Sequence, residues 1–228
     1  MVQDRRVAFI FRLCAFLFAT CGLMSHVGIF KGEFLPGAFM YYTIQSNLLA
    51  IILFGVLAVR TAVGLREGRK GNAGWYPRFG MVVAVNLLVT FVVFWGLLMP
   101  QGMDPAYLLS FDNIAVHTVT PLACLLDYVL FSPPRSLKYR DVYYVCIFPL
   151  FYALMTTIAG LSGYVFRYTA VSGANIAEAT PMRFPYFFLD FDILGIAVFA
   201  YMGAIMIFFL VLSHALYFID QKVRKPRV

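Results

Sequence analysis

A cluster of polar side chains interrupts an otherwise apolar stretch of the sequence over residues 39–64. Thr43, Ser46 and Asn47 are spaced i, i+3 and i+4, so they share one face if this stretch is helical. A threonine hydroxyl becomes a nucleophile when a neighbouring base takes its proton, and the amides and hydroxyls of Gln45, Ser46 and Asn47 are candidates to stabilise an oxyanion. The alternative is a polar stripe that joins helices by hydrogen bonds.

The candidate base is His117, in another apolar stretch of the chain. If both stretches cross a membrane in the same direction, Thr43 and His117 each lie about one turn below the outer end, so we expect them at the same depth. Three residues are candidates to orient the imidazole: Asn113, one turn earlier, and Asp190 or Asp192, from a long outer connection. A structural hydrogen bond is the alternative role for this histidine.

Other polar residues lie within apolar stretches. Asn86 and Tyr152 are candidates to line the same cavity. Asp127 follows His117 by ten residues, which places it about 15 Å deeper at the rise of a helix, so it cannot orient the imidazole. Arg12 is its expected partner in a structural polar network.

The sequence predicts neither a metal site nor a cofactor. The four cysteines lie inside apolar runs and lack the CxxC spacing of a zinc site or a redox pair. A haem with two histidine ligands would need His26 to face His117, the one histidine pair expected at a common depth, and we do not expect it. Glycine loops of the Walker or Rossmann type are absent from the sequence.

The composition indicates the elements that position these residues. The chain has 228 residues, of which 62% are hydrophobic and 13% charged, with a mean hydropathy of +0.82. These values exclude an ordinary soluble domain. A membrane-spanning helix needs about 20 apolar residues, and the apolar runs predict one all-α transmembrane domain over residues 1–228. Its six helices are expected near residues 7–30, 39–64, 79–99, 114–131, 142–162 and 193–219.

The basic residues predict the orientation of these helices. Fifteen of the 18 lysines and arginines fall in the two ends of the chain and in the second and fourth connections, and the exceptions are Lys31, Arg167 and Arg183. The positive-inside rule then predicts a multi-pass protein of the cell membrane with both termini in the cytoplasm. Because the net charge of +7 follows this pattern, it gives no support to nucleic-acid binding.

The longest outer connection contains the aromatic and proline-bearing segment 183–190, RFPYFFLD. Aromatic residues at this depth are typical of the interfacial belt of membrane proteins. A lid or re-entrant segment over a cavity is the functional alternative.

Three motifs in this order resemble a known family. They are the segment 42–47 (YTIQSN), His117 followed by Pro121 and Asp127, and the segment 184–190 (FPYFFLD). Together they are similar to the bacterial six-helix relatives of the androgen-induced-gene family of membrane proteins, whose animal members are threonine hydrolases of fatty-acid esters of hydroxy fatty acids. The resemblance implies a nucleophile on the second helix and a histidine partner on a later helix, here Thr43 and His117.

The sequence thus predicts an intramembrane hydrolase whose substrate is a membrane lipid or lipid-like ester. A non-catalytic transporter or lipid-binding protein that uses the same polar cavity is the alternative. A helper protein that packs against another membrane protein through glycines is a third possibility, but close packing within the bundle explains the glycines equally well. The sequence identifies no protein partner.

Overall fold

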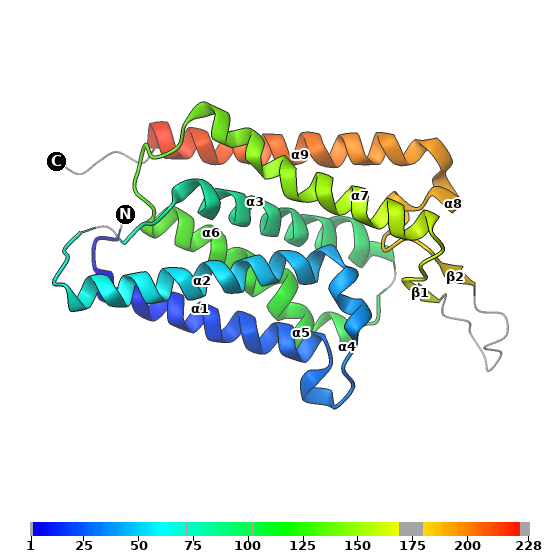
Figure 1. Cartoon of the computed structure of the whole chain (residues 1–228), viewed down its shortest axis with the longest axis horizontal. Coiled ribbons are helices and arrows are strands. Elements are labelled where there is room, and N and C mark those ends of the chain that lie inside the picture. The colour runs from blue at the N-terminus through cyan, green and yellow to red at the C-terminus, as the bar shows by residue number, and fades with distance from the viewer. Residues whose placement is uncertain (1, 72, 102, 169–179, 224–228) are drawn as a thin grey trace. The chain divides into compact units, whose positions relative to one another are not determined.

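The computed structural model describes residues 2–71, 73–101, 103–168 and 180–223 (Figure 1). Six helices in it are long and apolar enough to cross a membrane, which confirms the predicted all-α, multi-pass architecture. Their bounds are Arg5–His26, Tyr42–Arg66, Pro77–Gln101, Phe111–Phe131, Tyr139–Leu161 and Phe191–Lys222.

Two of these spans are unbroken α-helices and four are composite. The first two are α1 (Arg5–His26) and α2 (Tyr42–Arg66). The third joins α3 (Pro77–Val93), the π-helix η3 (Phe94–Leu98) and the 3-10 turn η4 (Met99–Gln101). The fourth joins α5 (Phe111–Ile114), the π-helix η5 (Ala115–Val119) and α6 (Thr120–Phe131). The fifth joins η6 (Tyr139–Cys146) and α7 (Ile147–Leu161), and the sixth joins α8 (Phe191–Leu194), η9 (Gly195–Ala197), α9 (Val198–Phe218) and η10 (Ile219–Val223).

Short elements lie in the connections between the spans. They are the 3-10 turns η1 (Ile29–Lys31), η2 (Pro36–Met40) and η8 (Phe187–Leu189), the short helix α4 (Pro105–Leu108), and the antiparallel strands β1 (Arg167–Tyr168) and β2 (Pro181–Met182). The predicted span bounds are correct to within a few residues. The second helix begins at Tyr42 and not at residue 39 because the proline-led segment Pro36–Met40 forms a 3-10 turn.

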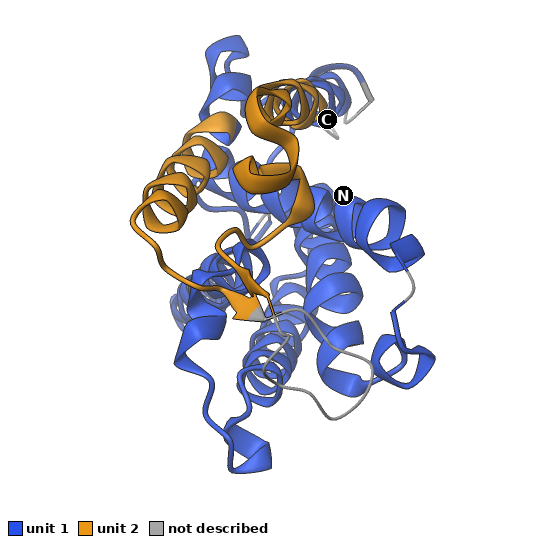
Figure 2. Cartoon of the chain, turned by 90° about the vertical axis from the view of Figure 1, so that its right-hand side faces the viewer, with its two compact units in different colours: residues 1–145, 209–228 blue, residues 146–208 orange. Residues whose placement is uncertain are grey.

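The described chain packs as two compact units, whereas the sequence predicts one six-helix domain (Figure 2). Unit 1 comprises residues 1–145 and 209–228, and unit 2 comprises residues 146–208. In unit 1 the most extensive helix contacts join α1 to α2 and α3 to α6. Leu23, Val27, Ile44 and Val116 form a buried apolar cluster between α1, α2 and η5.

A buried ion pair holds unit 1 together at mid-helix. The Arg12 guanidinium donates to both carboxylate oxygens of Asp127, at 2.6 and 3.2 Å, and also to Thr61 Oγ1 at 2.7 Å and the Ala73 carbonyl at 2.9 Å. Arg12 and Asp127 are 1% and 3% exposed. Arg12 and Asp127 are therefore partners, as the sequence predicts, in a network that ties α1, α2 and α6 to the loop before α3.

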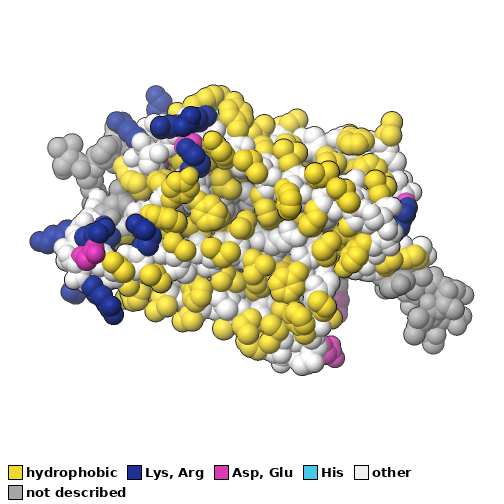
Figure 3. Space-filling view, viewed as in Figure 1, with side chains coloured by type: hydrophobic (Ala, Val, Ile, Leu, Met, Phe, Trp, Pro, Cys, Tyr) yellow, Lys and Arg dark blue, Asp and Glu magenta, His cyan; other side chains and the backbone are white. Residues whose placement is uncertain are grey.

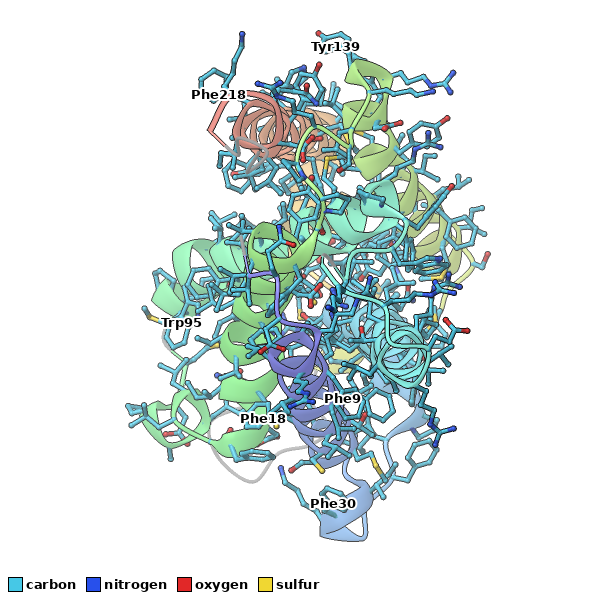
Figure 4. The ribbon with its side chains drawn as sticks, turned by 90° about the vertical axis from the view of Figure 1, so that its left-hand side faces the viewer. Phe9, Phe18, Phe30, Trp95, Tyr139 and Phe218 are labelled. Atoms are coloured by element: carbon cyan, nitrogen blue, oxygen red, sulfur yellow. The ribbon has the colours of Figure 1, made fainter. Side chains whose placement is uncertain are left out.

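Most basic side chains of unit 1, with Lys31 as an exception, gather at one end, where α1 begins and α9 ends, and apolar side chains cover the face beyond it (Figure 3). Arg224, Lys225 and Arg227, which the charge pattern assigns to the same side, lie outside the described residues. The exposed rings of Phe30, Tyr139 and Phe218 lie at the periphery of the view along the helices (Figure 4).

Unit 2 contains the aromatic segment, which packs on α7. A Cβ at Gly160 would lie 2.4 Å from the ring of Phe184 and 2.7 Å from the Arg183 carbonyl, so a glycine is needed there. Phe184 and Phe188 are buried within the unit. The aromatic segment therefore forms part of a packed structure, and the lid hypothesis stays a prediction.

Candidate functional site

The structure places Thr43 and His117 in contact inside unit 1. Thr43 Oγ1 lies 3.3 Å from His117 Nε2, and the two side chains are 8% and 5% exposed. Thr43 is the second residue of α2, and His117 lies at the centre of the π-helix η5. The two residues thus lie at one level of the bundle, 74 positions apart in sequence.

The second imidazole nitrogen fixes the direction of this hydrogen bond. His117 Nδ1 lies 3.2 Å from the backbone carbonyl of Asn113. Because a carbonyl oxygen can only accept, Nδ1 carries the proton, and in the neutral ring Nε2 is then an acceptor. The Thr43 hydroxyl therefore donates to Nε2, which is the arrangement that a general base requires.

The residue that orients the imidazole is Asn113, but it does so through its backbone. Its side-chain Nδ2 donates instead to the Leu108 carbonyl at 3.0 Å. Ser110 caps the short helix α5 by accepting from the Asn113 amide at 3.4 Å, which fixes the turn that precedes His117.

Aromatic rings hold the imidazole in place. The Phe94 ring stacks on His117 with centroids 3.7 Å apart and planes 17° apart, and the His26 ring meets His117 in a T-shaped contact at 5.9 Å. Trp95, the labelled residue of η3 in Figure 4, donates from Nε1 to Thr118 Oγ1 at 3.0 Å. These contacts join η3 to η5 and restrict the rotation of the imidazole.

Both facing segments are π-helical, and in each case a proline follows. Pro121 lacks an N–H, so the His117 carbonyl cannot accept the usual bond from a residue four positions later. The hydrogen bonds before Pro121 therefore follow the π-helical pattern, in which an N–H bonds the carbonyl five residues earlier. The Thr120 N–H, for example, donates to the Ala115 carbonyl. In η3 the Met99 N–H bonds the Phe94 carbonyl in the same way, just before Pro100. Such bulges turn side chains away from the regular helical face, and they are frequent at functional sites.

Close contact between α1 and η5 fixes the position of the segment that carries His117. A Cβ at Gly22 would lie 2.4 Å from the Cβ of Ala115, the first residue of η5. Two Cβ atoms cannot lie so close together, and neither can move without its backbone. Gly22 therefore allows α1 to pack directly against the segment that carries His117.

The polar neighbours of Thr43 on α2 are already engaged by other groups. Asn47 Nδ2 donates to the Thr43 carbonyl at 2.8 Å and to the Val116 carbonyl at 3.0 Å. Ser46 Oγ lies 3.1 Å from the Thr43 carbonyl, and Gln45 Nε2 donates to the Phe39 carbonyl at 3.0 Å. These side-chain donors hold the backbone around Thr43.

Asn86 belongs to a neighbouring network in unit 1. Its Oδ1 accepts from the Tyr42 hydroxyl, and its Nδ2 donates to the Val82 carbonyl at 2.7 Å and approaches the Val145 carbonyl at 3.5 Å. Thr90 connects this network to the site, because its Oγ1 donates to the Asn86 carbonyl and lies 3.2 Å from Ser46 Oγ.

Three further candidates lie in unit 2, where each has a local contact. Tyr152 is buried on α7, with its ring 6.5 Å from that of Tyr186. Asp190 caps α8 by accepting from the Asp192 amide at 2.9 Å. The Asp192 carboxylate accepts hydrogen bonds from Arg183, which raises the pKa of that guanidinium. A role for Asp190 or Asp192 in orienting His117 stays a prediction.

Several residues of the site are not apparent from residue type alone. Phe94 and Gly22 read as ordinary apolar and small membrane residues, and their roles depend on tertiary contact. Asp112, buried in α5, lies 3.6 Å from His26 Nδ1 and accepts from Lys31 Nζ at 3.2 Å. The available signal for the π-helical segments was the proline that follows each.

The chain matches no family model, no curated protein and no solved structure.

Proposed function

We propose that the chain is an intramembrane hydrolase of lipid esters with Thr43 as nucleophile and His117 as base. The observation that carries the proposal is the hydrogen bond between Thr43 Oγ1 and His117 Nε2, with Nδ1 held by a backbone carbonyl. A threonine needs such a base to act as a nucleophile. The motif resemblance described above supports the same assignment of roles.

In the first half-reaction, Nε2 of His117 takes the hydroxyl proton while Thr43 Oγ1 attacks the ester carbonyl carbon. His117 then returns the proton to the alkoxide of the leaving alcohol, and the acyl group stays on Thr43. Water cleaves the acyl-threonine in the second half-reaction and releases the carboxylic acid.

The oxyanion requires hydrogen-bond donors close to Thr43. The side-chain donors of Ser46 and Asn47 bind backbone carbonyls, and the Ile44 and Gln45 amides donate to the Tyr41 carbonyl. We therefore assign this role to the backbone amide of Thr43, at the start of α2. Helices leave the N–H groups of the first turn without intrahelical acceptors, and the helix dipole favours negative charge there.

The location of the site points to a lipid substrate. Thr43 and His117 lie in membrane-spanning helices near their outer ends, beside the buried apolar cluster of Leu23, Val27 and Val116. An ester with long acyl chains, similar to fatty-acid esters of hydroxy fatty acids, can keep its chains among the helices and present its carbonyl at this level. The chain would act in the cell membrane, in bacteria the inner membrane, with both termini in the cytoplasm.

The test is labelling of the detergent-purified protein with a lipophilic fluorescent fluorophosphonate, which reacts with activated hydroxyls. We expect the parent to be labelled and Thr43→Ala and His117→Ala not to be. Thr156→Ala is the matched control, because Thr156 is also buried but bonds only carbonyls of its own helix among the described residues. It should label like the parent.

Failure of a folded parent to label, or equal labelling of Thr43→Ala, would overturn the hydrolase proposal. Retention of a defined lipid by that unreactive protein would then favour the transporter or lipid-binding alternative. Size-exclusion elution of each variant establishes that the comparison is between folded proteins.

A further inference from the structure

Asn47 has a buried hydrogen-bond acceptor with no partner among the described residues. Its side chain is 0% exposed, and its Oδ1 makes no hydrogen bond there. The amide cannot be flipped to satisfy it, because Nδ2 already donates to the carbonyls of Thr43 and Val116, which can only accept. A buried polar atom without a partner costs about 1–3 kcal/mol, so its retention calls for an explanation.

Asn86 shows that the same kind of residue can be fully satisfied in this bundle. It is also 0% exposed, and its Nδ2 also faces backbone carbonyls, but its Oδ1 accepts from the Tyr42 hydroxyl. The difference between the two asparagines is therefore the unoccupied acceptor at Asn47.

The position of that acceptor relates it to the reaction. Asn47 bonds the carbonyl of the nucleophile, Thr43, and the carbonyl of Val116, the residue before the base. Its amide thus lies between the backbone of Thr43 and that of the segment carrying His117. Oδ1 can accept a hydrogen bond there from a donor such as an O–H group, but it cannot bind an anion or a carbonyl.

We infer that Asn47 Oδ1 binds the O–H nucleophile that cleaves the acyl-threonine, an inference that rests on the proposed function. In that step the O–H oxygen attacks the acyl carbonyl carbon, and His117 Nε2 takes its proton. The bond from the carbonyl carbon to Thr43 Oγ1 breaks, and the proton passes from His117 to Oγ1. Water gives a free carboxylic acid, whereas an alcohol gives a new ester.

Comparison of the two half-reactions distinguishes binding of the second nucleophile by Asn47 from a purely structural role of this residue. Fluorophosphonate labelling requires Thr43 and His117 but no second nucleophile, whereas turnover of p-nitrophenyl decanoate requires both steps. Asn47→Leu also removes the two hydrogen bonds to the Thr43 and Val116 carbonyls, so we expect slower labelling than in the parent. We expect turnover to fall at least about tenfold further than labelling, and a decanoyl group to accumulate on Thr43. Asn47→Asp, as a neutral acid, keeps an acceptor and one donor and should recover part of the turnover.

Asn86→Leu is the matched control, and it should change labelling and turnover by the same factor. The inference is overturned if labelling and turnover also fall together in Asn47→Leu, if turnover is unchanged, or if neither Asn47 variant folds, since Asn47 then serves only to join α2 to η5. An unlabelled parent would instead refute the proposed function itself. Added 1-decanol identifies the nucleophile in the parent, because decanoic acid reports water and decyl decanoate reports an alcohol.

Discussion

The chemistry of Thr43 depends on atoms that its neighbours supply. Its hydroxyl donates to His117 Nε2, and the imidazole can accept because its other nitrogen donates to the Asn113 carbonyl. Stacking on Phe94 and the contact with His26 keep the ring in that orientation. In the proposed reaction the pair is therefore already positioned before a substrate binds, and such positioning contributes to the rate.

At this scale we expect the hydroxyl, and not the size of the side chain, to determine activity. Thr43→Ser keeps a nucleophile that can reach Nε2 and should retain ester turnover, whereas the nearly isosteric Thr43→Val should abolish it. His117→Gln removes the base and should lower turnover by about 10²–10⁴-fold. Steady-state hydrolysis of a p-nitrophenyl ester by purified protein measures all three variants, and full activity of Thr43→Val would rule out Thr43 as the nucleophile.

Helical elements bring the pair together through local irregularities. The two π-helices η3 and η5 face each other through the Phe94–His117 stack and the bond from Trp95 to Thr118. α1 supports η5 from behind at Gly22. A regular α-helix would place His117 on a different face, so the positions of these segments are part of the site.

A methyl group at Gly22 should therefore displace the base without contacting the nucleophile. Because Gly22→Ala puts its Cβ against Ala115, η5 must shift, and a displacement of about 1 Å at a catalytic group costs about 10²-fold in turnover. Gly203→Ala is the control, since a Cβ there meets no atom within 4 Å among the described residues. Equal activity of the two variants in the ester assay would show that the Gly22 contact does not position His117.

The ion pair between Arg12 and Asp127 makes a separate prediction about stability. Asp127→Leu leaves a buried guanidinium without its counter-ion and should destabilise the protein by about 3 kcal/mol or more. Replacing both residues, as Arg12→Met with Asp127→Leu, should recover much of that loss. Thermal unfolding in detergent measures the stability of each variant. A double variant less stable than Asp127→Leu would contradict this prediction.

At the scale of the whole molecule, charge sets the orientation. Most basic side chains of unit 1, with Lys31 as an exception, lie at the end where α1 begins and α9 ends, and the site lies toward the opposite ends of α2 and the fourth span. By the positive-inside rule we propose that the site is near the outer leaflet.

This orientation predicts which connections a membrane-impermeant maleimide can reach in intact cells. In a background without the native cysteines, Glu33→Cys in the first connection should be labelled directly, and Lys70→Cys in the second should need permeabilised cells. The reverse pattern would place the site at the cytoplasmic leaflet.

The sequence was sufficient to predict the spans, the Arg12–Asp127 pair and the common depth of Thr43 and His117. Each of these depends on the length of an apolar run, on charge or on the rise of a helix. It could not show that the backbone of Asn113, and not its side chain, binds the imidazole, since that depends on the local course of η5. Nor could spacing show that the amide of Asn47 is occupied by two carbonyls. Such contacts arise from tertiary packing of segments far apart in the chain.

The most direct test of the central claim is to locate an acyl group on the protein. The parent would be mixed briefly with p-nitrophenyl decanoate, quenched in acid, digested and analysed by peptide mass spectrometry. We expect a decanoyl mass on Thr43, and no such adduct in His117→Gln treated in the same way. Hydrolysis by a parent that carries no acyl group on Thr43, or an acyl group at another residue, would contradict it.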